Sequence, residues 1–184
     1  MTSTLPPVTL RLLQLADAQA LLNIMLAGRE VYERYQPAKP EHQYTLAVTR
    51  DEIAKGLVRQ EADEEYTFGI FIGQDKLVGR IRLSAIHRAL WQNANLGYFI
   101  STPYQGRGFA TEAVRQAAAF AFQEIGLHRV QAAVMPWNPA SQRVMEKAGF
   151  RREGLAKRYL QINGVWEDHF IFALTAEEVE VVKD

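Results

Sequence analysis

The segment that decides the fold runs from residue 95 to residue 112 and reads NLGYFISTPYQGRGFATE. Its first part is typical of a strand, and its second part is a glycine-rich turn that opens a helix. Such a turn places free backbone N–H groups and the positive end of a helix against a phosphate. Gly106, Gly108 and the small Ala110 let the main chain come close. The motif is neither a Walker loop nor the dinucleotide Gly-x-Gly-x-x-Gly pattern. A tight strand-to-helix connection without a ligand is the alternative interpretation.

Hydrophobic periodicity on both sides of this segment predicts the other elements. Strands are expected over 8–13, 66–72, 77–86, 95–101, 128–135, 150–162 and 166–174. Helices are expected over 17–26, 29–35, 49–62, 109–125 and 139–147. Asp17 is expected as an N-cap, and Thr49 with Glu52 as a capping box. The order of elements predicts an α+β fold with one mixed, mostly antiparallel sheet of about seven strands flanked by helices.

Composition excludes several classes of function. The chain has 184 residues, 48% of them hydrophobic and 23% charged, which predicts a single domain over residues 1–184. It carries 21 Lys and Arg against 21 Asp and Glu, so no net charge draws it to nucleic acid or to an acidic membrane, and neither partner is expected. The absence of cysteine excludes a Cys nucleophile, a Cys-ligated metal and a disulfide. Any thiol chemistry therefore belongs to a cofactor.

Targeting and metal-binding signals are also missing from the sequence. The first residues have neither the basic nor the apolar region of a signal peptide, and no apolar run approaches the ~20 residues that span a bilayer. We therefore expect a cytoplasmic protein. His42, His87 and His128 have no metal-ligand spacing with each other or with carboxylates, so no metal site is expected.

Two further motifs follow the glycine-rich turn. They are Asn138-Pro139-Ala140-Ser141 and Glu146-Lys147-Ala148-Gly149-Phe150. With Gln-x-x-Gly-x-Ala at 105–110, they resemble the GCN5-related N-acetyltransferase (GNAT) superfamily. The Asn-x-x-Ser motif and residues 153–169 are similar to its ribosomal-protein-alanine N-acetyltransferase branch. The likeness spans about residues 5–175 and implies a GNAT-like sheet that is splayed open at an acetyl-CoA site.

The resemblance implies where acetyl-CoA, the expected co-substrate, would bind. Backbone N–H groups of 107–110 would cradle the diphosphate, and the pantetheine arm would lie along 98–100, where one N–H polarises the acetyl carbonyl. Gly97 is expected to form the bulge that opens the sheet. Asn138 would bind the pantetheine arm, and an N-cap is its alternative role. The expected cofactor-binding residues are Phe99, Ile100, Gln105, Gly106, Arg107, Gly108, Phe109, Ala110, Thr111, Asn138 and Ser141.

Two residues are expected to be catalytic. Many relatives place a Tyr before the Glu-Lys-x-Gly-Phe stretch to protonate the leaving thiolate, but this chain has Met145 there. The resemblance gives that role to Ser141, for which an exposed helix serine is the alternative. Without cysteine, the amine must attack acetyl-CoA directly in a ternary complex. An α-amine with a pKa of ~8 needs only a modest base. Glu153 is the second expected catalytic residue, as a candidate base, although a cross-strand ion pair is its favoured alternative role. Glu112, Glu167, Asp168, His169 and a water relay are further candidates, and the sequence does not choose among them.

The acceptor side of the cleft is less defined. Trp91, Tyr98, Tyr159 and Asp168 are expected to bind the acceptor, with core packing or structural hydrogen bonding as alternatives. Arg80, Arg82 and Arg88 are expected on a solvated strand face, with an acidic acceptor or ribosomal RNA as the alternative contact. The acidic residues Glu61, Asp63, Glu64 and Glu65 are expected in a solvated loop, or else as a collar for a cationic substrate.

The expected function is acetyl transfer from acetyl-CoA to an N-terminal α-amine of a protein, with a ribosomal protein as the acceptor that the resemblance implies. A small amine such as a polyamine, amino acid or antibiotic is the alternative acceptor, and a non-catalytic CoA sensor is an alternative of another class. The chain is expected to act as a monomer or a homodimer.

Overall fold

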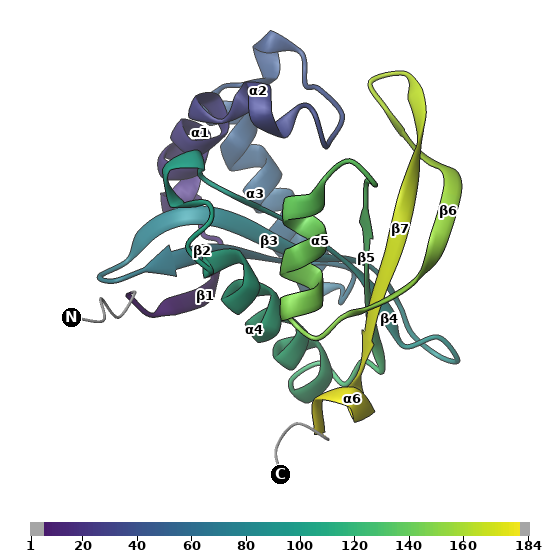
Figure 1. Cartoon of the computed structure of the whole chain (residues 1–184). Helices are drawn as coiled ribbons and strands as arrows, with labels where there is room; N and C mark the ends of the chain where they lie inside the picture. Colours follow the sequence, from purple (N-terminus) through teal and green to yellow (C-terminus); the bar gives the residue numbers. More distant parts are fainter. Residues whose placement is uncertain (1–5, 181–184) are drawn as a thin grey trace, which may run out of the picture.

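One mixed sheet organises the molecule (Figure 1). The computed structural model describes residues 6–180, and in it seven strands lie in the order β1-β2-β3-β4-β5-β7-β6. They are β1 (Val8–Leu12), β2 (Tyr66–Ile72), β3 (Lys76–His87), β4 (Asn93–Ile100), β5 (Arg129–Val134), β6 (Arg151–Ile162) and β7 (Val165–Thr175). β4 and β5 are parallel, and the other neighbouring strands are antiparallel. The predicted α+β architecture is confirmed.

Helices cover both faces of this sheet. They are α1 (Ala18–Ala27), α2 (Arg29–Tyr32), α3 (Leu46–Glu61), α4 (Phe109–Gln123), α5 (Pro139–Lys147) and α6 (Ala176–Glu180). Short 3-10 turns occupy η1 (Leu15–Asp17), η2 (Glu41–Gln43) and η3 (Thr102–Tyr104). In Figure 1, α4 and α5 lie together in front of the sheet, whereas α1, α2 and α3 gather on its other side. Within residues 6–180, no helix has both the length and the apolarity to cross a membrane.

The two helical layers bury separate apolar clusters. The larger cluster packs the alanine-rich stripe of α4, with Val114 fully buried, against Ile81 and Phe172 of the sheet. The smaller cluster lies under α1 and α3 and includes Leu21 and Ile53. Burial of such a side chain contributes ~1.5–3 kcal/mol, so these two clusters fix the sheet between the layers.

One of the two predicted helix caps is wrong, and the other holds in position only. α3 begins one turn earlier than expected, because the Thr45 hydroxyl accepts a hydrogen bond from the Val48 N–H at 3.3 Å. Thr49 is buried inside the helix and donates its hydroxyl to the Thr45 carbonyl at 2.9 Å. Asp17 occupies the N-cap position of α1 as predicted, but its carboxylate makes no capping hydrogen bond to that helix. It accepts from the Gln14 N–H at 2.7 Å and pairs with Arg11 at 3.0 Å instead.

The sheet opens between β4 and β5. These strands pair over three residues each, 93–95 with 129–131, and then diverge. The predicted bulge at Gly97 is wrong, because Gly97 stays in register with Arg82 of β3. The irregularity of that ladder lies between Ser84 and His87, where Ala85 has a φ of 49°. The opening therefore comes from the short pairing of β5 with β4.

Candidate active site

A cavity of about 370 Å³ occupies the gap between β4 and β5. Its walls come from both faces of the sheet. Tyr98 and Ser141 line it from the α5 side, whereas Arg80, Phe99 and His169 belong to its other walls. The cavity thus connects the face that carries α4 and α5 with the face that carries α1 to α3.

The edge of β4 offers free backbone donors to this gap. The Ser101 N–H donates to the Val78 carbonyl at 2.7 Å, so Ser101 faces β3. Because hydrogen-bonding direction alternates along a strand, the N–H of Phe99 also faces β3, and those of Tyr98 and Ile100 point into the gap. Phe99 is therefore wrong as a backbone donor to a ligand. Its side chain lines the cavity instead.

The glycine-rich turn has the conformation of an anion-binding loop. Gly106 and Gly108 adopt left-handed φ values of 72° and 84°, and α4 starts directly afterwards. Within the described residues, the N–H groups of 107–110 have no acceptor. The Gln105 side chain donates to the Ile100 carbonyl at 3.0 Å, so it anchors the turn to β4. The turn therefore presents four unsatisfied donors and a positive helix end at one point of the surface.

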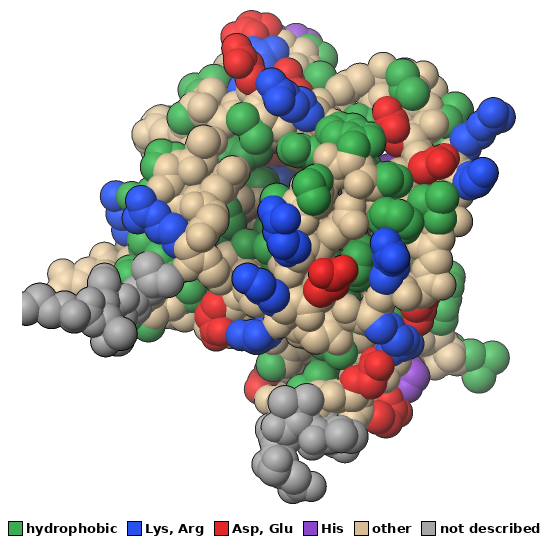
Figure 2. Space-filling view, in the orientation of Figure 1, with side chains coloured by type: hydrophobic (Ala, Val, Ile, Leu, Met, Phe, Trp, Pro, Cys, Tyr) green, Lys and Arg blue, Asp and Glu red, His purple; other side chains and the backbone are tan. Residues whose placement is uncertain are grey.

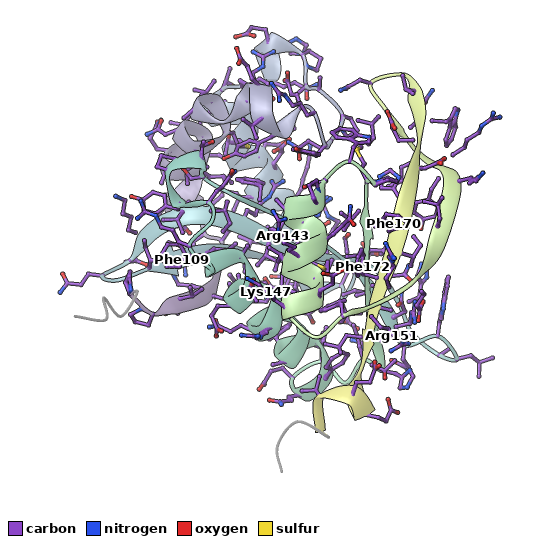
Figure 3. The ribbon with its side chains drawn as sticks, viewed as in Figure 1. Phe109, Arg143, Lys147, Arg151, Phe170 and Phe172 are labelled. Carbon is purple, nitrogen blue, oxygen red and sulfur yellow. The ribbon has the colours of Figure 1, made fainter. Side chains whose placement is uncertain are left out.

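Basic side chains surround this turn in a chain without net charge. Lys76 and Arg107 lie 5.0 and 5.7 Å from the ring centre of Tyr104. Arg143 and Lys147 are exposed one turn apart on α5, and Figure 3 labels both along that helix. Lys and Arg side chains stand out over α4 and α5 in Figure 2. Several phosphates could be neutralised along this face.

Asn138, Ser141 and Tyr98 form a connected hydrogen-bond chain. The Asn138 carboxamide oxygen accepts from the Ser141 N–H at 3.1 Å, which is the N-cap predicted for α5. Its amide nitrogen has no partner in the described part of the chain and remains a donor. The Ser141 hydroxyl lies 3.1 Å from the Tyr98 hydroxyl. Burial raises the pKa of Tyr98 to about 12, so the phenol keeps its proton at neutral pH. Met145 is fully buried in the core.

His169 is a candidate base that the sequence did not single out. It is 3% exposed, lines the cavity and packs 5.9 Å from the ring of Tyr159. Its Nδ1 lies 3.0 Å from the Glu167 carbonyl, which can only accept, so Nδ1 carries the proton and Nε2 has a free lone pair. Neighbouring Asp168 instead accepts from the Arg158 N–H at 2.8 Å and lies outside the cavity lining. Asp168 thus holds an irregular turn of β6, where Arg158 has a φ of 51°.

Two expected site residues lie elsewhere. Glu153 hydrogen-bonds Arg129 at 2.6 and 2.9 Å and Arg151 at 2.8 Å, and these partners, Arg129 first, lower the pKa of Glu153 to about 2. A carboxylate so strongly paired is a poor base, so the alternative prediction for Glu153, a cross-strand ion pair, is confirmed. Trp91 is 58% exposed, packs against His87 at 5.1 Å and lines neither cavity.

A second cavity, of about 450 Å³, adjoins the first beneath α1 and α3. Arg80 and Arg82 line both cavities. Arg82 is exposed, as expected for a solvated strand face, whereas Arg80 is half-buried, so that expectation is wrong for Arg80. Arg88 is held by Asp63 and by the Ile125 carbonyl at 2.7 Å. Glu65 is buried in ion pairs with Arg59 and Arg82, so it belongs to neither a solvated loop nor an acidic collar.

The β6–β7 turn closes over the cavities. The Asn163 amide nitrogen donates to the Glu33 carbonyl at 2.8 Å, and the Ala38 N–H donates to the Asn163 oxygen at 2.7 Å. These bonds tie the turn to the loop after α2 (Figure 1). No group of three His, Asp or Glu side chains in residues 6–180 is arranged to hold a metal ion.

Known proteins share this architecture. The family model described as Acetyltransferase (GNAT) domain matches residues 8–151. Probable N-acetyltransferase YjcK of Bacillus subtilis (strain 168) is 42% identical over 91% of this chain and 93% of its own length. Ribosomal protein uS5-alanine N-acetyltransferase of Escherichia coli (strain K12) is 29% identical, covering 93% of this chain and 89% of the relative. The structure of Mycobacterium smegmatis RimJ in complex with CoA-disulfide is similar, with a TM-score of 0.89 and 30% identity, and covers 94% of this chain and 83% of that one. The chain therefore belongs to the GNAT family and is an N-acetyltransferase.

Proposed function

We propose that this chain transfers the acetyl group of acetyl-CoA directly to the N-terminal α-amine of a protein, with a ribosomal protein as the expected acceptor. The observation that carries the proposal is the cavity through the β4–β5 gap, which opens to both faces of the sheet. A donor on the α4–α5 face and an acceptor on the opposite face can meet there. The similarity to a uS5-alanine N-acetyltransferase supports the choice of acceptor.

The donor side is assigned from the turn and the edge of β4. The N–H groups of 107–110 bind the diphosphate, assisted by the Arg107 side chain and the Thr111 hydroxyl. The pantetheine arm lies in the gap against the Asn138 amide. The N–H of Tyr98 or Ile100 donates to the acetyl oxygen and stabilises the oxyanion as the tetrahedral intermediate forms. Gln105 and Gly106 shape the turn.

The transfer requires one proton acceptor and one proton donor. The amine nitrogen attacks the acetyl carbon, a C–N bond forms, and the C–S bond breaks to release CoA thiolate. His169 Nε2 takes the proton that the amine loses. Ser141 donates its hydroxyl proton to the leaving sulfur, and the protonated Tyr98 beside it resupplies that proton. After the products leave, His169 releases its proton to solvent and Tyr98 regains one from solvent. Tyr159, against His169, forms part of the acceptor wall.

A polyamine acceptor fits this cavity poorly. Among the described residues that line the gap there are two arginines and no carboxylate, so a polycation would meet like charge. An amino acid or an antibiotic amine remains the competing acceptor. A catalytically silent CoA sensor is disfavoured, because the hydrogen-bonded hydroxyls of Tyr98 and Ser141 supply a proton donor at the gap. The cytoplasmic location stays a prediction.

The direct test compares amines as acceptors at one concentration of acetyl-CoA and follows CoA release. We expect turnover with peptides that begin with Ala or Ser, and none with the same peptides blocked at the N-terminus but carrying an internal lysine. Turnover with spermidine or lysine side chains alone would contradict the proposal. Mass spectrometry of ribosomal proteins from cells with and without this chain then identifies the acceptor by one missing acetyl group.

A further inference from the structure

Arg80 is a cation without a carboxylate partner in the wall between the two cavities. It is half-buried, and no ion pair or hydrogen bond within residues 6–180 engages its guanidinium. The guanidinium carbon lies 5.1 Å from the ring centre of Phe99, whose ring in turn packs 4.7 Å from Tyr32. Burial lowers the pKa of Arg80 to about 10, so the group is still charged at neutral pH. The guanidinium is therefore partly desolvated, and a carboxylate partner at this position would compensate its charge.

The nearby carboxylates are already engaged. Glu65 lies 3.3 Å from Arg59 and 3.8 Å from Arg82, and it accepts a hydrogen bond from the Thr67 hydroxyl at 2.9 Å. Glu52 pairs with Lys39. The described lining of the second cavity has four cationic side chains, Lys39, Arg59, Arg80 and Arg82, against two carboxylates, Glu52 and Glu65. The cavities therefore hold an excess of positive charge, and Arg80 is the cation left unpaired.

Arg80 also lies close to the reacting atoms of the proposed transfer. It is opposite Phe99 in the β3–β4 ladder, and the flanking N–H groups of Tyr98 and Ile100 point into the gap. One extended residue spans ~3.3–3.6 Å. When the amine of an acceptor is positioned at the acetyl carbon, the residue that carries this amine lies within reach of the Arg80 guanidinium. In a peptide acceptor, the next one or two residues do so as well.

We propose that Arg80 selects acceptors that carry a carboxylate within about two residues of the reacting amine. The carboxylate is either an acidic side chain near a peptide N-terminus or the α-carboxylate of a small amino compound. The proposal rests on the proposed acetyl transfer to an amine. Arginine suits this task because its planar fork binds a carboxylate through two hydrogen bonds, and the Phe99 ring holds one face of the plane.

The test measures kcat/KM for matched acceptors. The peptide arm compares C-terminally amidated peptides that differ only by Glu or Gln at position 2 or 3, and the small-molecule arm compares alanine with alaninamide. The carboxylate member of at least one pair should be preferred about tenfold or more. Arg80→Gln should abolish the preference by slowing only that member, and Arg80→Lys should restore part of it. Arg50→Gln, at an exposed arginine of α3 outside both cavities, should leave the preference unchanged.

Equal rates for both members with the unsubstituted protein, or an equal loss for both in Arg80→Gln, would overturn the proposal. If no amine is acetylated, the proposed function fails. The role of Arg80 is then tested separately, by measuring how tightly the protein binds a peptide with and without a carboxylate. Titration calorimetry in the presence of CoA would compare N-acetyl-Ala-Glu amide with its Gln counterpart. Tighter binding of the Glu form, lost in Arg80→Gln, supports the proposal, and equal or absent binding refutes it. An unfolding midpoint that is not lowered by the substitution shows that the variant is folded.

Discussion

The hydroxyl oxygens of Tyr98 and Ser141 lie 3.1 Å apart, and this hydrogen bond joins β4 to α5 across the gap in the sheet. Ser141 is held a second time, because its N–H donates to the Asn138 side chain at 3.1 Å. The serine hydroxyl therefore has a defined position at the gap. Since burial raises the pKa of Tyr98 to about 12, the phenol beside it remains a proton donor throughout the physiological range.

Replacement of Ser141 tests its role toward the leaving thiolate. Ser141→Ala should lower kcat about 100-fold, the usual contribution of a positioned acid, and leave the KM for acetyl-CoA within about threefold. Ser141→Thr keeps a hydroxyl and should recover much of the loss. Steady-state kinetics across pH 6–9 measure kcat and the KM for acetyl-CoA of both variants. Unchanged turnover and an unchanged pH profile in Ser141→Ala would exclude the acid role.

The glycine-rich turn can be tested with a matched pair of glycines. Gly108 and Gly126 have left-handed φ values of 84° and 63°, and an added Cβ would meet nothing within 4 Å at either position. Each Gly→Ala change should therefore cost ~1–2 kcal/mol of stability through backbone strain alone. Gly108→Ala should in addition weaken acetyl-CoA binding about tenfold or more, because its Cβ projects where the diphosphate would approach. Calorimetry measures the Kd of each variant for acetyl-CoA, and a Kd that rises equally in both variants, or in neither, would contradict the assignment.

Local signals in the sequence were sufficient for the elements they control. α5 spans 139–147 as predicted, because Asn138 caps its first turn, Pro139 fixes its first residue and Gly149 follows its end. The glycine-rich turn and the start of α4 at Phe109 were also predicted correctly, because Gly106 and Gly108 adopt the left-handed backbone that this turn requires. The start of α3 was missed because Thr45 and Thr49 are both plausible caps by sequence. Only the burial of Thr49 distinguishes them.

Residues whose role depends on a partner from another strand could not be placed from sequence. Glu153 meets Arg129 because β6 and β5 both flank β7, an order that is visible only in the sheet. Arg80 and Arg82 alternate with buried residues as a solvated face does, and Arg82 is indeed exposed. Arg80 is half-buried instead, because it lines the wall between the two cavities. His169 was one of several ionisable candidates until its burial and its bond to Glu167 set it apart.

The contribution of His169 to turnover should be largest at a pH at which the acceptor amine is mostly protonated. His169→Gln should lower kcat/KM for the acceptor about 100-fold at pH 7, because no other described lining side chain of the gap readily accepts a proton there. Above a pH of ~8 an α-amine is free without help, so the defect should shrink. Asp168→Asn keeps the oxygen that accepts from Arg158 and serves as the control, with near-normal activity. A defect that is equal at every pH would assign His169 to structure alone.

Glu153 should contribute to stability in a pH-dependent manner and contribute nothing to turnover. Its pKa in the folded protein is about 2, below its ordinary value of 4.5, so the ion pairs stabilise the fold above about pH 5. That stabilisation disappears as the pH falls from 4.5 toward 2. Glu153→Gln should lower the free energy of unfolding by about 1 kcal/mol at pH 7, or the melting temperature by about 2–4 °C.

The difference in melting temperature between the wild-type chain and Glu153→Gln should narrow steadily as the pH falls from 5 to 2. Thermal unfolding at each pH measures it. Glu64→Gln, at an exposed carboxylate with no ion pair in the described residues, should show no such dependence. The kcat of Glu153→Gln should stay within about twofold of wild type, because Arg129 and Arg151 hold the carboxylate outside the cavity. A large loss of kcat at unchanged stability would return Glu153 to the catalytic machinery, and the ion pairs would then have to break during turnover.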